Sequence, residues 1–190
     1  MPWDPPELRW LPPEAQELVR FACTRMVHSY KPVLMLAIMD QLPAVEFSAG
    51  VLADAFVQFY ADRERRGLPV GRRGSRFSQE QQFDAAACRL TATDILRHVF
   101  YRERGCLRLR RGQVMLAKTD AWLSLHEPRN SPLARQLLRD ALHDFYELIV
   151  FQGEAAYGQR QPDSEADPVV LFLPDPDDRD DLHLLWPEDS

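Results

Sequence analysis

The apolar positions of residues 14–66 recur at helical spacing and predict three helices in succession. These helices run from about residue 14 to Ser29, from Lys31 to Asp40 and from Ser48 to Arg66. The second contains the longest apolar run of the chain, Val33–Met39, so we expect it to be buried nearly all round. A tight turn separates the second helix from the third, and Ser48 is placed to cap the third.

Downstream, the pattern changes from helical spacing to strand alternation. Ser78–Leu90 is weakly periodic and predicts a helix, and a second helix is predicted over Thr91–Arg104. Thr91 and Asp94 have the spacing of a capping box, which favours a helix start at this point. Cys106–Ala117 then predicts a β-hairpin, because two strand-like runs flank the two-residue turn Arg111-Gly112.

The C-terminal third combines helical spacing with an acidic tail. A short helix is predicted over Ala121–His126, and a long amphipathic helix over Leu133–Gln152, capped by Ser131. Beyond it lie a polar linker and an acidic segment that contains two apolar stretches, Val169–Leu173 and Leu182–Trp186. Such stretches are poorly suited to free solution, so we expect parts of the tail to dock on another surface.

Together these elements predict a mainly α protein with a small β-hairpin (class α+β). Helices followed by a hairpin give the order of a winged-helix module, so the core is expected to be winged-helix-like. We expect a proline-rich lead (1–13), a winged-helix-like domain (14–126), a long helix packed on it (127–152) and an acidic tail (153–190).

The net charge of −6 conceals a strong asymmetry along the chain. Residues 63–111 carry 13 arginines and five acidic residues, which gives this segment a net charge of +8. Residues 160–190 carry ten acidic residues and two arginines, for a net charge of −8. An acidic protein can still bind an anionic partner, because a polyanion responds to local charge.

The basic segment coincides with the predicted helix and hairpin. In a winged helix, one helix can enter the major groove of DNA while the hairpin contacts phosphate or the minor groove. Leu107 and Leu109 alternate with Arg108 and Arg110, so these two arginines share one face of a strand. The alternative is a winged helix used for protein contact, with its arginines paired to acids or solvated.

We therefore expect non-catalytic binding to duplex DNA, with affinity supplied by contacts between arginines and phosphates. The acidic tail has two interpretations: a solvated segment, or an autoinhibitory arm that takes the place of DNA phosphate on the basic face. The candidate contact residues are Arg72, Arg73, Arg76, Arg97, Arg102, Arg104, Arg108, Arg110 and Arg111.

Residues 20–125 also resemble a module found at the N-terminus, or as a linker, in bacterial restriction-type HNH endonucleases and defence-associated helicases. The resemblance rests on Ser29–Asp40 and on the pattern Phe59, Tyr60 and Arg63 within Ser48–Arg66, followed by Gly67-Leu68. It implies a winged-helix-like fold and a DNA-handling or antiviral defence context. The nuclease is not implied, because the HNH cluster of histidines and asparagine is absent. The polar or special positions that match are Tyr30, Lys31 and Pro32.

Catalysis is not expected from the sequence. The five histidines are scattered, and no Gly-rich phosphate loop, G-x-S-x-G or H-E-x-x-H motif is present. The three cysteines, Cys23, Cys88 and Cys106, are too far apart in sequence for a metal motif at short spacing. We expect no cofactor and no metal site.

The remaining expectations concern location and partners. The N-terminus is acidic and proline-rich, unlike a signal peptide, and no apolar run reaches the length of a membrane span, so we expect a cytoplasmic protein with no membrane partner. The alternative function is an adaptor or structural subunit of a multi-protein defence complex. A larger helicase or nuclease subunit would then be the partner, and a homodimer also stays open.

Overall fold

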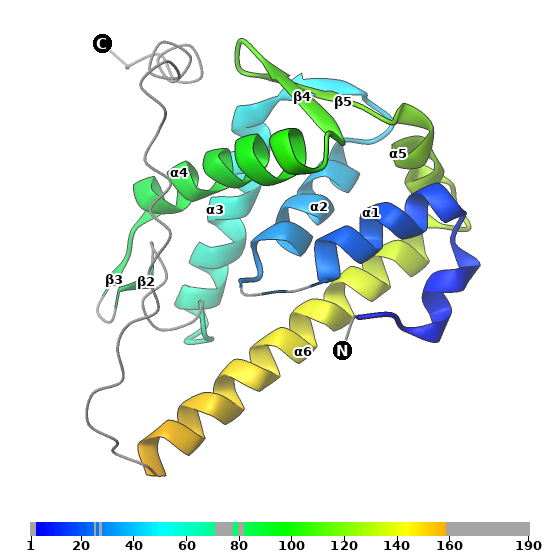
Figure 1. Cartoon of the computed structure of the whole chain (residues 1–190). Helices are drawn as coiled ribbons and strands as arrows, with labels where there is room; N and C mark the ends of the chain where they lie inside the picture. Colours follow the sequence, from blue (N-terminus) through cyan, green and yellow to red (C-terminus); the bar gives the residue numbers. More distant parts are fainter. Residues whose placement is uncertain (1–2, 25, 27, 71–77, 80–81, 159–190) are drawn as a thin grey trace, which may run out of the picture.

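The longest apolar run of the chain forms the centre of the structure. The computed structural model describes residues 3–24, 26, 28–70, 78–79 and 82–158, and in it α2 extends over Tyr30–Gln41. All of Val33–Met39 is buried apart from the half-buried Leu36, as the sequence predicts. Around α2 pack α1 (Pro13–Cys23), α3 (Ala49–Arg65) and α6 (Ser131–Gly158) (Figure 1). The fold is mainly helical with a small antiparallel sheet, which confirms the predicted class.

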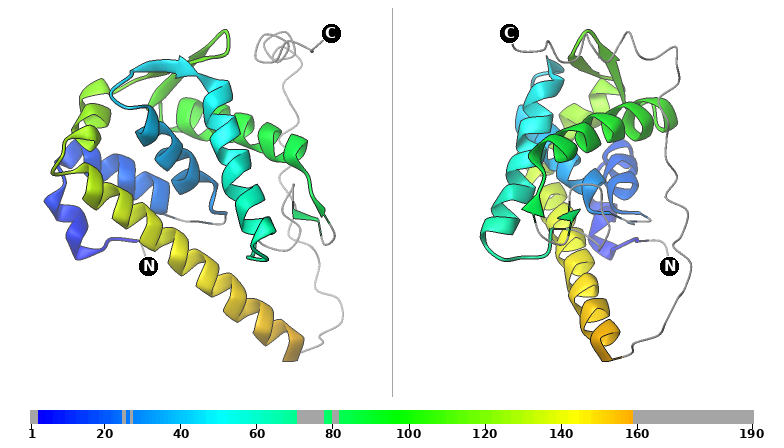
Figure 2. Two further views of the ribbon diagram at one scale, coloured as in Figure 1. Left: turned by 180° about the vertical axis from the view of Figure 1, so that it is seen from behind. Right: turned by 90° about the vertical axis from the view of Figure 1, so that its left-hand side faces the viewer.

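The sheet joins the predicted hairpin to a strand that the sequence analysis missed. β4 (Leu107–Arg110) and β5 (Gln113–Leu116) form the hairpin, and β1 (Glu46–Ser48) pairs antiparallel with β5. The strand order is therefore β1-β5-β4. From α2 to β5 the chain forms a helix, a strand, a second helix, two short strands, a further helical segment and a hairpin. This winged-helix-like core is seen from behind and from one side in Figure 2.

One continuous helical segment replaces the two helices predicted between residues 78 and 104. α4 (Ala85–Ile95) leads directly into η2 (Leu96–Glu103), a π-helix. The predicted helix start at Thr91 is wrong, because the Asp84 carboxylate accepts hydrogen bonds from Ala86 N and Ala87 N and caps the helix seven residues earlier. The Thr91 hydroxyl instead donates to Ala87 O within the helix, at 2.9 Å.

The segment before α4 is extended where it was predicted to be helical. β2 (Ser78–Gln79) pairs antiparallel with β3 (Gln82–Phe83), so the helix predicted over Ser78–Leu90 is formed only from Ala85 onward. The Phe83 amide donates to Glu64 Oε1 at 2.8 Å, which attaches this hairpin to the end of α3. Asp84 then begins the helix, since its side chain satisfies amides that have no partner in a first helical turn.

The two ends of the described core also differ in detail from the prediction. The lead contains a short 3₁₀ helix, η1 (Pro6–Trp10), whose Leu8 is buried, and α1 ends at Cys23 rather than Ser29. α5 (Thr119–His126) follows Lys118, whose φ of 56° lies in the left-handed region, without a side-chain cap from Thr119 or Asp120. The linker and tail segments predicted beyond residue 158 lie outside the described residues.

α6 lies along α1 and α2, and its C-terminal end projects beyond the other helices (Figures 1 and 2). It begins at Ser131, so this serine is the first helical residue rather than the cap, and it continues six residues past the predicted end at Gln152. Arg135 of α6 donates to Asp40 Oδ1 at 2.6 Å and to Met39 O at 3.0 Å, which fastens α6 to the end of α2.

A buried chain of hydroxyl groups connects the middle of α6 to the core. The Ser29 hydroxyl lies 2.7 Å from the Tyr60 hydroxyl and 2.8 Å from the Tyr146 hydroxyl. Tyr146 donates its single hydroxyl proton to Val70 O at 3.2 Å, so Ser29 must donate to Tyr146 and Tyr60 to Ser29. The residues before α2, in α3, in α6 and after α3 are therefore connected by directed hydrogen bonds.

Candidate nucleic-acid interface

The predicted contact arginines fall into two groups. Arg72, Arg73 and Arg76 lie outside the described residues, so their predicted contacts stay predictions. The other six lie on η2, on the residue that follows it and on the hairpin of β4 and β5. Two neighbouring elements of the winged-helix-like core thus carry all the predicted arginines that the structure describes.

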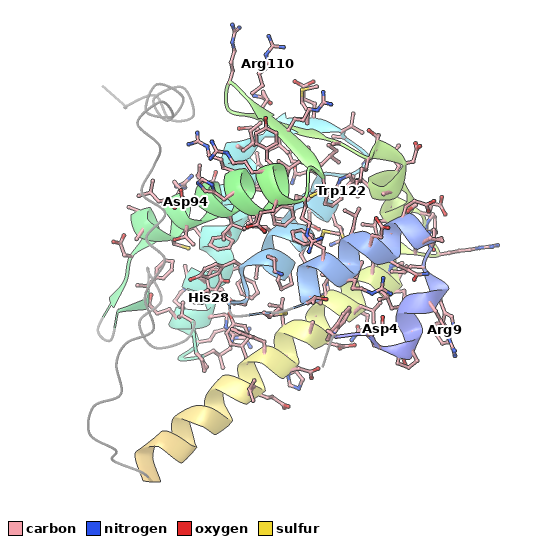
Figure 3. All side chains as sticks on the ribbon, viewed as in Figure 1. Asp4, Arg9, His28, Asp94, Arg110 and Trp122 are labelled. Atoms are coloured by element: carbon pink, nitrogen blue, oxygen red, sulfur yellow. The ribbon has the colours of Figure 1, made fainter. Side chains whose placement is uncertain are left out.

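The hairpin has the geometry that its sequence predicts. Arg111 and Gly112 both have positive φ, 48° and 73°, as a two-residue turn between right-twisted strands requires. Leu107 is buried and Leu109 half-buried, whereas Arg108 and Arg110 are exposed, so the alternation places both arginines on the outer face. In Figure 3 Arg110 extends from the hairpin away from the helices.

Cross-strand neighbours leave the hairpin arginines available for an external anion. Arg108 pairs in register with the exposed Met115, and Arg110 with the exposed Gln113. The carboxylate in the row of Arg108 belongs to Glu46, which pairs with Met115 and so lies two strands away. Among the described residues, neither strand arginine nor Arg111 forms an ion pair. This surface therefore presents uncompensated positive charge.

η2 adds arginines at the side of the core. Arg97 is half-buried, whereas Arg102 and Arg104 are exposed. The π-helical turn closes with a hydrogen bond from Arg104 N to Val99 O at 3.2 Å, five residues back. Arg104 folds over Phe21 of α1, with its Cζ 5.0 Å from the ring centroid, so part of its charge faces the groove between η2 and α1.

Several other arginines of the basic segment are engaged within the fold. Arg89, one of the 13 arginines counted in residues 63–111, forms an ion pair with Asp54 of α3. Arg63 donates from Nε to Pro69 O at 2.7 Å and stacks on Tyr146. Arg65 and Arg66 both approach Asp62, at 3.2 and 3.5 Å. The net charge counted from the sequence thus overstates the positive charge that is available to a partner.

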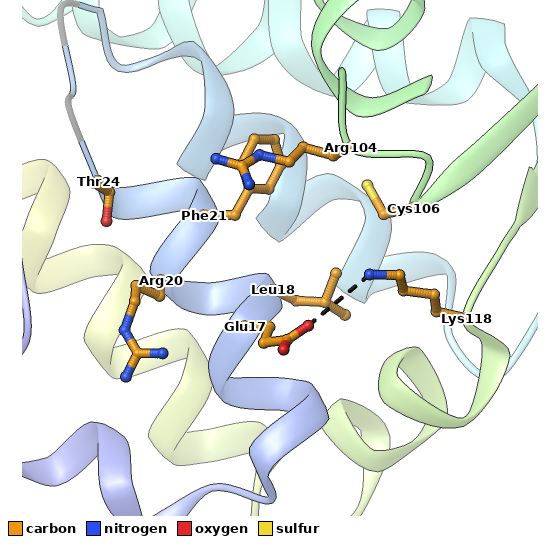
Figure 4. Close-up of a pocket in the computed structure, with 8 residues that line it drawn as sticks. All are labelled: Glu17, Leu18, Arg20, Phe21, Thr24, Arg104, Cys106 and Lys118. Atoms are coloured by element: carbon orange, nitrogen blue, oxygen red, sulfur yellow. Dashed lines mark ion pairs between the residues drawn. The ribbon is translucent and has the colours of Figure 1, made fainter. Parts of the chain in front are cut away.

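The same region contains a cation that the sequence analysis did not include. Lys118 follows β5, and its side chain points toward Cys106 and Glu17, opposite Arg104 (Figure 4). Only the scarcity of lysine, two in the whole chain, marks it in the sequence. Its position depends on a left-handed backbone conformation that no propensity predicts for lysine.

The buried cysteines show no sign of an activated thiol. All three are free. Burial is the main cause that raises the pKa of Cys23 and of Cys88 to about 12, and that of Cys106 to about 11. The described part of the chain contains no cluster of three or more His, Cys, Asp or Glu residues that could hold a metal ion. Within that same part, no helix combines the length and the apolar character needed to cross a bilayer.

Comparison with protein-family models, with curated proteins and with solved structures gives no match. The arginine-bearing hairpin and η2 are therefore interpreted from their own geometry and charge. That geometry offers cations on two adjacent elements of a winged-helix-like core, which can contact an extended anion at several points.

Proposed function

We propose that this protein binds duplex DNA without catalysing a reaction on it, through its winged-helix-like core. The observation that carries the proposal is the cluster of exposed arginines on the hairpin, at Arg108, Arg110 and Arg111, with no ion-pair partner among the described residues. Exposed, unpaired cations on one strand and its turn release counterions from a phosphate backbone, and that release favours binding.

In this proposal the hairpin and η2 contact the same duplex. η2 lies next to β4 in the structure, so Arg97 and Arg102 can approach one groove while Arg108 and Arg110 contact the flanking backbone. Arg72, Arg73 and Arg76, in the segment between α3 and β2, would add further phosphate contacts. The proposal assigns no side chain to contacts with base edges. It therefore predicts affinity for DNA but no sequence preference.

Binding to duplex and single-stranded DNA across a salt series tests this function. The logarithm of the association constant is expected to fall with the logarithm of salt concentration, by about 0.9 for each phosphate neutralised. Arg108→Gln and Arg110→Gln should each lower affinity and reduce this slope by about one contact. Arg9→Gln, an exposed arginine on η1, serves as the matched control (Figure 3). A flat salt response, or slopes unchanged by both hairpin substitutions, would contradict the proposal.

In this proposal the acidic tail can compete with DNA for the arginines of the same chain. Residues 160–190 carry a net charge of −8, which equals in magnitude the charge of the basic segment. A chain ending at residue 159 should therefore bind DNA at least as tightly as the full chain, and more tightly if the tail covers the arginines. Loss of DNA binding in that shortened chain would count against the proposed interface.

A second candidate function is that of an adaptor subunit in a multi-protein complex. It is favoured by Trp10, which is 67% exposed beside a groove formed with Pro12, Pro132 and Leu133. Exposed tryptophan is frequent at protein interfaces, where it anchors a partner. The resemblance to modules of HNH endonucleases and defence-associated helicases suggests a larger helicase or nuclease as that partner, in the cytoplasm. Co-purification with such a subunit after nuclease treatment, abolished by Trp10→Ser, would favour this candidate.

A further inference from the structure

A pocket of about 400 Å³ opens between α1, the end of η2 and the residues that follow β5. Its walls come from Phe21 and Thr24 of α1 and its C-cap, Arg104 and Cys106, and Lys118, with Glu17 at the mouth (Figure 4). Arg20 also lines it but turns toward Asp4, with which it forms an ion pair at 3.0 Å. None of the hairpin arginines Arg108, Arg110 and Arg111 lines the pocket.

Arg104 and Lys118 line this pocket together with Cys106, and a third cation, Lys31, lies outside the lining. The charges of Lys118 and Arg104 both lower the pKa of the Cys106 thiol, against the larger effect of burial, which raises it. Lys31 stands behind the wall, where its Nζ donates to Phe21 O at 3.0 Å and to Thr24 O at 2.7 Å. Burial lowers the pKa of Lys31, and the charge of Arg104 lowers it further, so these two cations are neighbours.

The carboxylates near the pocket do not neutralise these cations. Glu17 approaches Lys118 at 3.9 Å, but the two side chains are 72% and 55% exposed, and such a pair contributes little. The other nearby carboxylate is Glu103, whose charge acts on Lys31. Two carboxylates thus face three cations, Lys31, Arg104 and Lys118, which leaves a positive field in a partly enclosed space. An anion in such a space is screened less by water than one on an open surface.

One further observation concerns the backbone of a residue that lines the pocket. Lys118 has a left-handed backbone, which is uncommon for lysine and is found at ligand-binding positions.

We propose that this pocket binds a phosphomonoester dianion. Arg104 and Lys118 would hold the phosphate oxygens from opposite sides. Glu17 occupies the position beside Lys118 in the free protein and is displaced when the dianion binds. The ligand is either the terminal phosphate of a nucleic-acid strand or a small phosphate ester. The inference depends on the pocket and not on the hairpin, so it stands independently of duplex binding.

Titration of the full chain with inorganic phosphate, followed by calorimetry, tests the pocket directly. Arg104→Gln and Lys118→Asn should each weaken phosphate binding by about tenfold, the usual effect of one charge-assisted hydrogen bond. Asparagine is chosen because it tolerates the left-handed conformation at position 118. Glu17→Gln should strengthen binding, because it removes the competing carboxylate. Arg9→Gln, remote on η1, should bind phosphate like the unaltered protein.

A second titration separates the two sources of phosphate. If 5′-phosphorylated oligonucleotides bind more tightly than 5′-hydroxyl ones, and Lys118→Asn removes the difference, the pocket takes a strand end. If inorganic phosphate binds through Arg104 and Lys118 but both oligonucleotides bind equally, it takes a small phosphate ester. The proposal is overturned if neither the unaltered protein nor Glu17→Gln binds phosphate. It is also overturned if Lys118→Asn, with unchanged thermal unfolding, binds phosphate as Arg9→Gln does.

Discussion

The guanidinium of Arg63 lies over the ring of Tyr146, with its Cζ 3.4 Å from the ring centroid. The contact joins the end of α3 to the middle of α6, while the hydroxyl of the same tyrosine lies 2.8 Å from Ser29 Oγ. One side chain of α6 therefore combines a cation–π contact with a buried hydrogen-bond chain. Tyr146 is therefore a polar attachment of α6 to the core in addition to Arg135.

Tyr146→Phe should destabilise the protein by about 1–3 kcal/mol, the cost of leaving buried polar groups without partners. The substitution keeps the ring under Arg63 but removes the acceptor of the Ser29 proton and the donor to Val70 O. Urea denaturation measures the change in the free energy of unfolding. Tyr101→Phe, at a tyrosine that is 42% exposed, is the control and should change it by less than about 0.5 kcal/mol. Equal effects of the two substitutions would show that the hydroxyl chain contributes nothing.

The same hydroxyl groups predict a loss of stability in alkali. Burial is the largest cause that raises the pKa of Tyr60 and of Tyr146 above the ordinary value of 10.0. The unfolded chain then releases these protons at lower pH than the folded protein does. The stabilising contribution is complete below pH 10 and is lost as the pH rises from 10 through the folded pKa values.

Free energies of unfolding measured between pH 8 and pH 11 check this expectation. The unaltered protein should lose stability above pH 10, and Tyr146→Phe should lose less over the same interval, because it has one fewer hydroxyl to ionise. The lowered pKa of Lys31, caused mainly by burial, acts in the opposite direction and is common to both proteins, so it cancels in the comparison. If stability falls equally with pH in the two proteins, ionisation of Tyr146 does not contribute to the loss in alkali.

The start of α4 gives a third prediction. Asp84→Ala should cost about 1 kcal/mol, because Ala86 N and Ala87 N lose their side-chain acceptor. Asp84→Asn should retain most of the stability, since an amide oxygen can accept the same hydrogen bonds. Thermal or urea unfolding of the two variants distinguishes a capping role from a simple loss of charge. If both variants are equally destabilised, charge rather than capping is responsible.

The sequence was sufficient where local chemistry determines the structure. Ser48 caps α3 by accepting from Gly50 N at 3.2 Å, as its position before an apolar-periodic segment predicts. The Arg111-Gly112 turn and the alternation of Leu107 to Arg110 were also predicted correctly, because a two-residue turn and a period of two are both short-range properties. The arginine-bearing hairpin of the candidate site follows from these two features alone.

Features that depend on partners far away in the sequence were not predicted. β1 contains only Glu46–Ser48, and its strand character comes from β5, which lies 65 or more positions later in the chain. The ion pair of Arg89 with Asp54 was not predictable, because the two residues are 35 positions apart in the sequence. The choice between Asp84 and Thr91 as the helix start also had no local answer, since both residue types act as caps. Lys118 lacked any sequence signal of its conformation.

The hairpin turn supplies the final prediction, which separates stability from DNA binding. Arg111 has a φ of 48°, a conformation that asparagine adopts more readily than arginine, and Asn-Gly is the favoured sequence for this turn. Arg111→Asn should therefore raise the free energy of unfolding by about 0.5 kcal/mol, yet lower DNA affinity and reduce the salt slope by about one contact. Arg111→Lys, which keeps the charge without easing the turn, is the matched control and should leave both quantities nearly unchanged. A more stable Arg111→Asn protein that binds DNA as tightly as before would remove Arg111 from the proposed interface. A less stable Arg111→Asn protein would contradict the expectation that asparagine suits the positive φ at this position better than arginine.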